Sequence, residues 1–366
     1  MMDNIERQIM DQTLYDLSRL NILIVDDCEF ARRTISNVLR VLKVGKLTLA
    51  KDGGEAIEEI KKSVESSAVV GQCSIDIIIT DWLMDPINGA MLTRWVRRSG
   101  DSPDRFMPVV ALSGAVEEVH ISEARDIGVT EFIAKPFSIS SVAKRLVSVI
   151  EQPRQFIFNG DYFGPDRRRK PMNIKGEDRR VISPNNIEVI YSGKKPESLD
   201  TEAKIWHFKL PNNLKGKFST GNAVGTIDPG LLEAAEEHLQ SMEDDYADWV
   251  ADNIKEMLTH YEALKNEPVN PWRHLTELGR IAHQLRGQGG TFGYNLITIF
   301  GKSLVDCTSV KRDIDDNLLD FIKAHIDAVQ AVLRDSIRGH GGPIGEELVK
   351  MLDKAREKYT SQQTAA

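Results

Sequence analysis

The chain has 366 residues, a formal net charge of -8 at pH 7, 41% hydrophobic residues and three scattered cysteines. This length predicts two or three regions, and the apolar content is sufficient for buried cores. The negative charge argues against binding to nucleic acid or to an anionic membrane surface. The cysteines are too scattered for a metal site and are expected to be reduced thiols. Because the sequence has no apolar run of roughly 18 residues and no signal-peptide pattern, we expect a cytoplasmic protein.

Residues 1–19 precede the first predicted strand. Within them, apolar side chains recur among charged residues at roughly helical spacing, at Ile5, Ile9, Leu14 and Leu17. We expect a short amphipathic helix here. It either packs on the domain that follows or serves a dimer or another partner.

Residues 20–150 alternate between strand and helix patterns. The strands are expected near 21–25, 46–50, 75–80, 108–112 and 130–134, with helices between them and after the last. This alternation predicts a parallel sheet with helices on both faces. Right-handed crossovers then place the first and third strands side by side.

Acidic residues follow the first and third of these strands. The first strand leads to Asp26 and Asp27, and the third, whose run 77–79 has the pattern of a strand buried on both faces, leads to Asp81. If the two strands are neighbours, three carboxylates converge and require a cation. So small a set of hard oxygen ligands suits Mg²⁺, which keeps several waters.

Polar residues also follow the fourth and fifth strands, namely Ser113 and Lys135. A hydroxyl, an ammonium group and a metal ion around one carboxylate form a site for a tetrahedral anion, which Asp81 can attack as a nucleophile. The alternative is an acidic cluster at the strand ends of some other flavodoxin-like protein.

These motifs resemble those of the receiver domain of two-component response regulators. They are the acidic pair 26–27, the run Asp-Trp-Leu-Met-Asp-Pro-Ile-Asn-Gly at 81–89, Leu-Ser-Gly ending at Gly114, and Lys-Pro-Phe at 135–137. The family often has proline where Asp85 stands. The resemblance implies an α/β flavodoxin-like receiver over 20–150, with a parallel five-stranded sheet in the order 2-1-3-4-5.

The same resemblance implies roles for individual residues. Asp81 would be the phosphoacceptor, and Mg²⁺ would be held by Asp26, Asp27, Asp81 and the backbone carbonyl of Leu83. Ser113 and Lys135 would bind the phosphoryl oxygens, and Phe132 matches the aromatic switch position of the family.

Two positions beside the site, Leu83 and Ala115, are apolar. Receivers that lose their phosphoryl group quickly tend to carry polar residues there, which position water. We therefore expect a rather stable acyl phosphate, unless these two positions vary without consequence.

Residues 151–225 have a different character, since periodicity disappears and 14 Lys and Arg stand against 9 Asp and Glu, a balance of about +5. We expect a basic irregular linker, which either docks on an acidic surface or remains a solvated tether. The apolar pieces 187–190 and 206–210 are compatible with local strands or with docking elements.

Residues 226–362 are typical of an all-α helical bundle. Asp228-Pro229 and Asn270-Pro271 each pair an N-cap with a proline at the first helical position. Helices are expected at 229–264 with one break, 271–300 with an extension to 309, 315–337 and 343–360. Their apolar stripes predict an antiparallel arrangement.

His283 is the candidate reactive residue of this bundle. On a helical wheel it lies roughly 120° from the core-facing residues Leu275, Leu278, Ala282 and Leu285. Gly279, Gly287 and Gly290 share its face, which would leave the imidazole uncovered, and Arg280 and Arg286 flank it and would offset phosphate charge. The alternative is an ordinary exposed histidine on a helix that ends at Gly287.

This stretch resembles the histidine phosphotransfer (HPt) domain over about 227–340. His283, Leu285, Arg286, Gly287 and Gly293 match the family signature, whereas Gly289 and Gly290 depart from it mildly. The resemblance implies that His283 carries a phosphoryl group to or from a receiver aspartate.

Together the two resemblances predict a phosphorelay protein and not a metabolic enzyme, since the sequence has no ATP-binding kinase signature, helix-turn-helix or cyclase motif. The implied partners are a sensor or hybrid histidine kinase and another receiver or HPt protein. The main alternative is a receiver-gated module whose bundle binds a partner without phosphotransfer. A third hypothesis makes Asp81 a phosphate sink for another relay.

Overall fold

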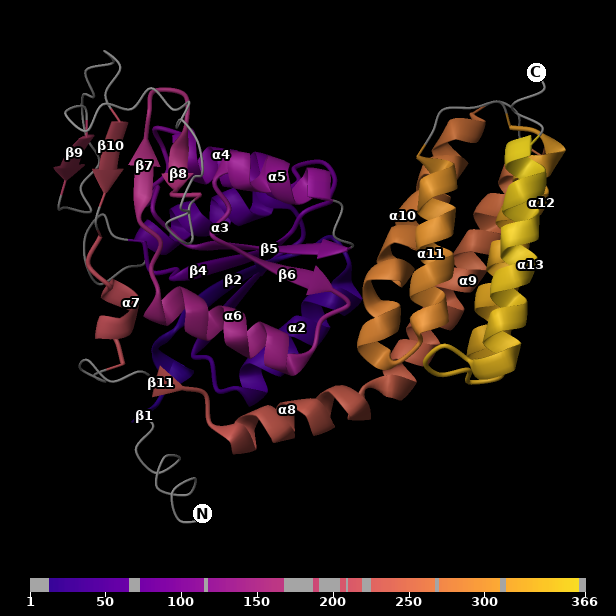
Figure 1. The fold of residues 1–366 in the computed structure, drawn as a ribbon, viewed down its shortest axis with the longest axis horizontal. Coiled ribbons are helices and arrows are strands. Elements are labelled where there is room, and N and C mark those ends of the chain that lie inside the picture. Colours follow the sequence, from indigo (N-terminus) through magenta and orange to yellow (C-terminus); the bar gives the residue numbers. More distant parts are fainter. Residues whose placement is uncertain are drawn as a thin grey trace, which may run out of the picture. The chain divides into compact units, whose positions relative to one another are not determined.

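A computed structural model describes residues 13–65, 73–114, 118–167, 187–190, 205–208, 210–218, 225–266, 270–309 and 314–361. The chain divides into two compact units, with the boundary near Glu236 (Figure 1). The first is an α/β unit and the second is helical. None of the described helices is long and apolar enough to cross a bilayer. The first 12 residues of the predicted N-terminal helix lie outside the described residues.

The first unit is built on a five-stranded sheet with the strand order β3-β2-β4-β5-β6. Its strands are β2 (Asn21–Val25), β3 (Lys46–Ala50), β4 (Ile77–Asp81), β5 (Val109–Gly114) and β6 (Glu131–Lys135). Its helices are α2 (Glu29–Val41), α3 (Gly53–Glu65), α4 (Gly89–Arg98), α5 (Glu118–Ile127) and α6 (Ile139–Glu151). Helices α2 and α6 lie on one face and α3, α4 and α5 on the other (Figure 1). The predicted flavodoxin-like fold and its strand order 2-1-3-4-5 are confirmed.

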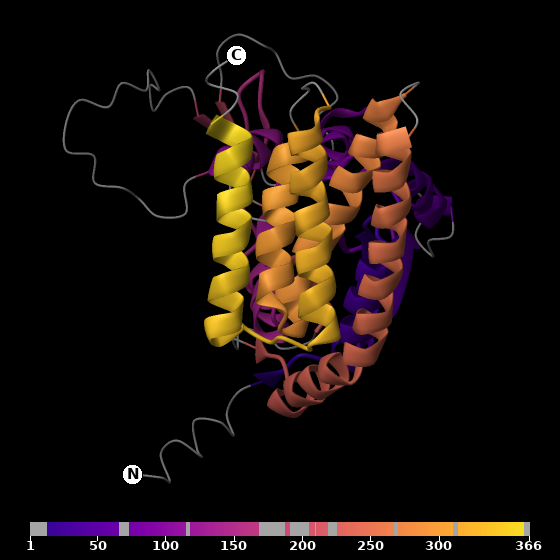
Figure 2. The same cartoon turned by 90° about the vertical axis from the view of Figure 1, so that its right-hand side faces the viewer.

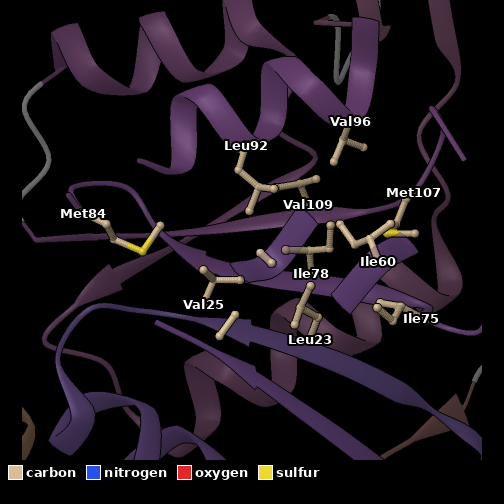
Figure 3. Packing of buried hydrophobic residues seen from close by; sticks show 12 residues of the cluster. Leu23, Val25, Ile60, Ile75, Ile78, Met84, Leu92, Val96, Met107 and Val109 are labelled. Carbon is tan, nitrogen blue, oxygen red and sulfur yellow. The ribbon is translucent and has the colours of Figure 1, made fainter. Parts of the chain in front are cut away.

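The core under α3 and α4 explains why the central strands carry unbroken apolar runs. Leu23, Val25 and Ile78 project from the strands toward Ile60 and Leu92 of the helices, and all five are buried (Figure 3). The opposite side chains of β4, such as those of Ile77 and Ile79, are equally buried because helices cover both faces. Burying a side chain of this size stabilises the fold by about 1.5–3 kcal/mol.

The end of the predicted N-terminal helix is not helical. Residues 13–14 form a short strand, β1 (Thr13–Leu14), followed by a 3-10 turn at Leu17–Arg19. Strand β1 pairs in parallel with β11 (Gly225–Thr226), and the Tyr15 N–H donates to the Thr226 carbonyl at 2.8 Å. This tertiary pairing takes the backbone groups that a helix would have used, so it overrides the helical spacing.

The basic segment after α6 is more ordered than expected. It contains β7 (Phe156–Phe158), β8 (Phe163–Pro165), β9 (Ile187–Ile190) and β10 (Ile205–Phe208), which form a second sheet in the order β8-β7-β10-β9, and a short helix α7 (Asn213–Gly216). Strands β9 and β10 agree with the local-strand alternative for the apolar pieces 187–190 and 206–210, whereas β7, β8 and α7 were not expected in an irregular linker. Phe156, Phe163 and Phe208 pack around Phe106 of the first unit, with ring centroids 5.1, 5.2 and 5.5 Å from it.

Ion pairs join this segment to the α/β domain, as the docking alternative requires. Lys215 Nζ lies 2.7 Å from Glu151 Oε2, and Lys217 Nζ lies 2.6 Å from Asp76 Oδ1. The Glu151 carboxylate also accepts hydrogen bonds from the Tyr15 hydroxyl and, at 2.8 Å, from the Gly225 N–H. Burial and the Glu151 carboxylate raise the pKa of Tyr15 well above its ordinary range. Burial alone would raise the pKa of Glu151, but the hydrogen bonds from Lys215 and Tyr15 hold it below its ordinary value.

The second unit is a helical bundle, shown side-on in Figure 2. Helix α8 (Pro229–Ser241) leads into α9 (Glu243–Asn266), α10 (Pro271–Gly289), a 3-10 turn at Gly290–Phe292, α11 (Asn295–Thr308), α12 (Asp316–Arg334) and α13 (Gly342–Ser361). The expected break in the first long helix is confirmed at Met242. A single helix over 271–300 is wrong, because Gly293 adopts a left-handed backbone (φ 77°) and the Tyr294 N–H closes the turn on the Gly289 carbonyl at 2.8 Å.

Helices α10 and α11 approach so closely that glycines are needed between them. A Cβ atom at Gly301 would lie 2.8 Å from the Ala282 carbonyl oxygen, and one at Gly279 would lie 2.7 Å from Thr308 Oγ1. The core residues predicted for α10, namely Leu275, Leu278, Ala282 and Leu285, are all buried.

One buried histidine belongs to this core. His325 of α12 lies with Nδ1 2.8 Å from the Phe321 carbonyl and Nε2 2.9 Å from Ser303 Oγ. Burial lowers the pKa of His325 to about 4, so the imidazole is neutral at pH 7.

Candidate functional site

The strand register brings the predicted acidic residues together. β2 and β4 pair in parallel with Val25 opposite Thr80, so the residues that follow, Asp26 and Asp81, reach the same edge of the sheet. One carboxylate oxygen from each of Asp26, Asp27 and Asp81 lies within 4.8 Å of the others. Asp26 and Asp81 are buried and Asp27 is half-buried. The sequence placed this cluster correctly because parallel neighbours end at a common edge.

Backbone N–H groups fix two of these carboxylates. The Cys28 N–H donates to Asp26 Oδ1 at 2.9 Å, and the Trp82 N–H donates to Asp81 Oδ1 at 2.8 Å. These bonds are local and follow from the turn that each aspartate begins. They orient the carboxylates before any ligand binds, which lowers the entropic cost of binding.

The turn after β4 holds the chain close to Asp81. The Gly89 N–H donates to the Trp82 carbonyl at 3.2 Å, and a Cβ atom at Gly89 would lie 2.3 Å from the Asp81 carbonyl oxygen. Asn88 then caps α4 by accepting a hydrogen bond from the Met91 N–H at 2.9 Å. The Asn-Gly pair therefore combines a helix start with a close backbone approach.

The remaining predicted site residues occupy the neighbouring strands. β4 pairs with β5 so that Asp81 lies opposite Leu112, which places Ser113 one residue beyond. Lys135 is the last residue of β6, the strand next to β5. Leu83 follows Asp81 by two residues and is 45% exposed. Ala115 lies outside the described residues.

Phe132 of β6 lies beside the acidic site without being part of it. It is half-buried and packs against a small cluster that contains Trp82, Ala111 and Val129. Trp82, a member of this cluster, is the residue after Asp81.

The α/β unit also has a cavity of about 450 Å³, far from these carboxylates. Ile75, Pro108 and Thr130, which precede β4, β5 and β6, line it together with Phe156 and Leu214 of the segment after α6. It therefore lies at the amino edge of the sheet, whereas parallel sheets bind ligands at the carboxyl edge.

His283 lies in α10 and is half-buried, between the buried residues Ala282 and Leu285. Two expectations about its surroundings need correction. Gly279 packs against Thr308 of α11 and does not leave its face open. Arg280 pairs with two carboxylates, with Nε 2.7 Å from Glu277 Oε2 and Nη2 2.9 Å from Glu256 Oε1.

Arg286, the second predicted flanking arginine, is buried. Its backbone lies against α11, since a Cβ atom at Gly301 would come within 2.9 Å of the Arg286 nitrogen. Gly279 and Gly301 therefore serve the close helix pair, a role that a helical wheel of one helix does not reveal.

The sequence patterns did not single out one cluster of the bundle. Glu256 and His260 of α9 and Glu277 of α10 each place one ligand atom within 4.8 Å of the others, and His274 contacts His260. The spacings of four residues on α9 and three on α10 are the signal that would have found it, because such residues share a helix face.

Comparison with known proteins bears on the first unit. Residues 22–147 match the family described as the response regulator receiver domain. The chemotaxis protein CheY-3 of Vibrio cholerae is 30% identical over 133 residues, which are 36% of this chain and 93% of that protein. The chemotaxis protein CheY of Pseudomonas aeruginosa is 29% identical over 133 residues, which are 36% of this chain and 98% of that protein.

Among solved structures, the chemotaxis response regulator CheY4 of Vibrio cholerae is 25% identical, with a TM-score of 0.31, and the match covers 36% of this chain and 98% of that structure. The relatives are thus matched over almost their whole length by the part of this chain that carries the acidic cluster. The chain belongs to the response regulators of two-component signalling through a receiver domain at residues 22–147.

Proposed function

We propose that Asp81 accepts a phosphoryl group from a phosphohistidine of a sensor or hybrid histidine kinase. The observation that carries this proposal is the strand register that gathers Asp26, Asp27 and Asp81 within 4.8 Å at the carboxyl edge of the sheet. Three carboxylates at such distances repel one another, and a divalent cation offsets the repulsion. Hard oxygen ligands of this number fit Mg²⁺.

The chemistry is an in-line transfer. The P–N bond of the donor breaks, an O–P bond to Asp81 forms, and the departing imidazole takes up a proton. Ser113 of β5 and Lys135 of β6 hold the phosphoryl oxygens by a hydroxyl and an ammonium group. Asp26, Asp27 and Asp81, with the Leu83 carbonyl, would hold Mg²⁺, which neutralises charge that develops on the phosphoryl group.

We extend the proposal to the helical unit, where His283 carries a phosphoryl group to or from a receiver aspartate as in an HPt domain. Two features support it: the bundle architecture and the half-exposed position of His283 between core residues. An imidazole is a competent nucleophile near neutral pH. The partner in that exchange is a receiver aspartate, in this chain or in another protein.

The test follows the phosphoryl group after incubation of the full chain with Mg²⁺ and a phosphorylated kinase fragment. Acyl phosphates are lost in base and phosphohistidine is lost in acid, so the two linkages are distinguishable. Base-labile label that disappears in Asp81→Asn but persists in the matched control Asp85→Asn, an exposed aspartate of the same loop, is the expected result for the receiver.

For the bundle, base-stable label is expected that disappears in His283→Gln and persists in His340→Gln, which changes an exposed histidine. If that label also requires Asp81, the two residues exchange phosphate. If the wild-type chain carries no base-stable label after incubation with phosphorylated receivers and kinases, the HPt assignment is overturned. The bundle would then be an interaction module. Label on Asp81 alone would still agree with the receiver proposal.

A further inference from the structure

Helices α9 and α10 present a second group of ligand-type side chains, which the proposed phosphotransfer does not use. Glu256 and His260 are four residues apart on α9, and His274 and Glu277 are three residues apart on α10. Each pair therefore shares one face of its helix, and the two faces meet. All four residues lie within the helical unit.

The distances fit a single ion with three protein ligands. One atom each from Glu256, His260 and Glu277 lies within 4.8 Å of the others, and His260 Nε2 lies 3.9 Å from Glu256 Oε1. In a tetrahedral zinc site with bonds of 2.0–2.2 Å, ligand atoms are about 3.3–3.6 Å apart. Side-chain adjustments of about 1 Å would therefore close the three groups around an ion and leave a fourth position for water.

The fourth residue, His274, orients His260. The two Nδ1 atoms are 2.9 Å apart, so one ring donates to the other and His260 Nε2 points away from that bond, toward Glu256. A ligating histidine nearly always has its other ring nitrogen held in this way.

The two carboxylates of this cluster already pair with a cationic side chain, that of Arg280. The Arg280 guanidinium bonds to both Glu256 and Glu277, at 2.9 and 2.7 Å. Its side chain is 38% exposed, so the pairing is screened by water and is replaceable at low cost. A divalent ion would bind the two carboxylates more strongly, since it adds a coordinate bond to an imidazole.

We propose that a divalent transition-metal ion, with Zn²⁺ as the best fit, binds between α9 and α10 through Glu256, His260 and Glu277, displacing Arg280 from the carboxylates. The mixed nitrogen and oxygen ligands select such ions over Mg²⁺, which prefers oxygen alone. The ion joins α9 to the helix that carries His283. The proposal does not depend on His283 being a phosphoacceptor.

Zn²⁺ titration of the full-length, tag-free protein tests this site. Excess Mg²⁺ is kept present, and affinity is measured by competition with a chromophoric chelator. The wild-type protein is expected to bind one more tight Zn²⁺ ion than His260→Ala. His274→Phe removes a residue that orients a ligand, and it should weaken Zn²⁺ binding by roughly 10–100-fold. Glu277→Gln removes a ligand itself, so it should weaken Zn²⁺ binding by at least as much.

Arg280→Met separates a metal site from a simple network of ion pairs. At a metal site this change removes a competing cation, so Zn²⁺ should bind at least several-fold more tightly. The matched control His340→Ala, at an exposed histidine of the same unit, should leave the affinity unchanged. Co²⁺ should give the visible absorption of a four-coordinate site in the wild-type protein and not in Glu277→Gln.

Two results would overturn the proposal. One is equal Zn²⁺ stoichiometry and affinity for the wild-type protein, His260→Ala and Glu277→Gln, which would assign any bound zinc to other groups. The other is a loss of Zn²⁺ binding in Arg280→Met with the helical circular dichroism unchanged, since this would show that Arg280 supports the site and does not compete for it.

Discussion

A Cβ atom at Gly89 would lie 2.3 Å from the carbonyl oxygen of Asp81. The carbonyl oxygen is a backbone atom, so no flexible side chain can move aside to make room for the Cβ atom. The first turn of α4 is therefore held against the end of β4, and the loop between them, which contains Leu83, takes its path from that contact.

We predict that Gly89→Ala shifts this loop and impairs the acidic site. Overpacking of this kind costs about 1–3 kcal/mol, and the Mg²⁺ affinity should fall because the carboxylates and the Leu83 carbonyl lose their alignment. Urea unfolding and Mg²⁺ titration monitored by isothermal calorimetry would measure both effects. Gly100→Ala is the control, since nothing lies within 4 Å of its Cβ position. Wild-type Mg²⁺ affinity in Gly89→Ala would contradict the prediction.

Asp27→Asn should remove most of the stabilisation that Mg²⁺ provides. At a Mg²⁺ concentration about 100-fold above Kd, binding stabilises a fold by about 2.7 kcal/mol. The variant should gain much less at the same concentration. Without Mg²⁺ it should be as stable as the wild type or more stable, because one of three neighbouring negative charges is gone. Thermal unfolding with and without Mg²⁺ measures this, and an equal Mg²⁺ effect in both proteins would count against the metal site.

The acyl phosphate at Asp81 should be long-lived, and Leu83→Asn should shorten its life. Leu83 is 45% exposed, so the substitution leaves the core intact. A polar side chain there positions water, and such assistance accelerates hydrolysis by up to roughly 100-fold. Decay of the base-labile label at neutral pH with Mg²⁺ gives both rates, with Leu83→Ala as the control. A wild-type half-life of seconds would refute the first statement.

The stability of the helical bundle should fall on mild acidification because of His325. Its pKa is about 4 in the folded chain and 6.5 in the ordinary reference state. The folded state therefore binds fewer protons between these values, so the stabilisation is complete above pH 6.5 and is lost as pH falls toward 4. The shift corresponds to roughly 3 kcal/mol.

Urea unfolding followed by helical circular dichroism at several pH values between 7.5 and 4.5 would reveal this dependence. His325→Gln, which does not titrate in that range, should show a shallower dependence on pH than the wild-type protein. Equal slopes for the two proteins would assign the acid sensitivity to other groups.

The sequence was sufficient to predict the strands and the strand order of the α/β domain, because the patterns that indicate them are local and repeated. The apolar run 77–79 predicts a strand buried on both faces, and the position of Asp81 after it predicts the site, since parallel strands share a carboxyl edge. The segment after α6 gave weaker signals, since only the apolar pieces 187–190 and 206–210 suggested strands and neither fixed the pairing of the second sheet. Three of its short strands pack aromatic rings against Phe106, a residue some 50 to 100 positions earlier, and no periodicity in the sequence indicates that contact.

The bundle shows a second limit of sequence patterns. The wheel of α10 placed Leu278 and Leu285 in the core correctly, but it assigned Gly279 to an open face. Which face of a helix is open depends on its neighbours, here Thr308 of α11. The break at Gly293 was missed for a related reason, because glycine is tolerated within helices and only the left-handed backbone ends this one.

The carboxylate of Glu151 has a practical consequence for dissecting the chain. It receives the Tyr15 hydroxyl, the Gly225 N–H and the Lys215 ammonium group, so segments some 200 residues apart end at one side chain. A fragment trimmed to the family match at 22–147 would lack all four groups. It would also expose Phe106 and other apolar surface that the second sheet covers, and should aggregate more readily than a fragment running from residue 13 to residue 227.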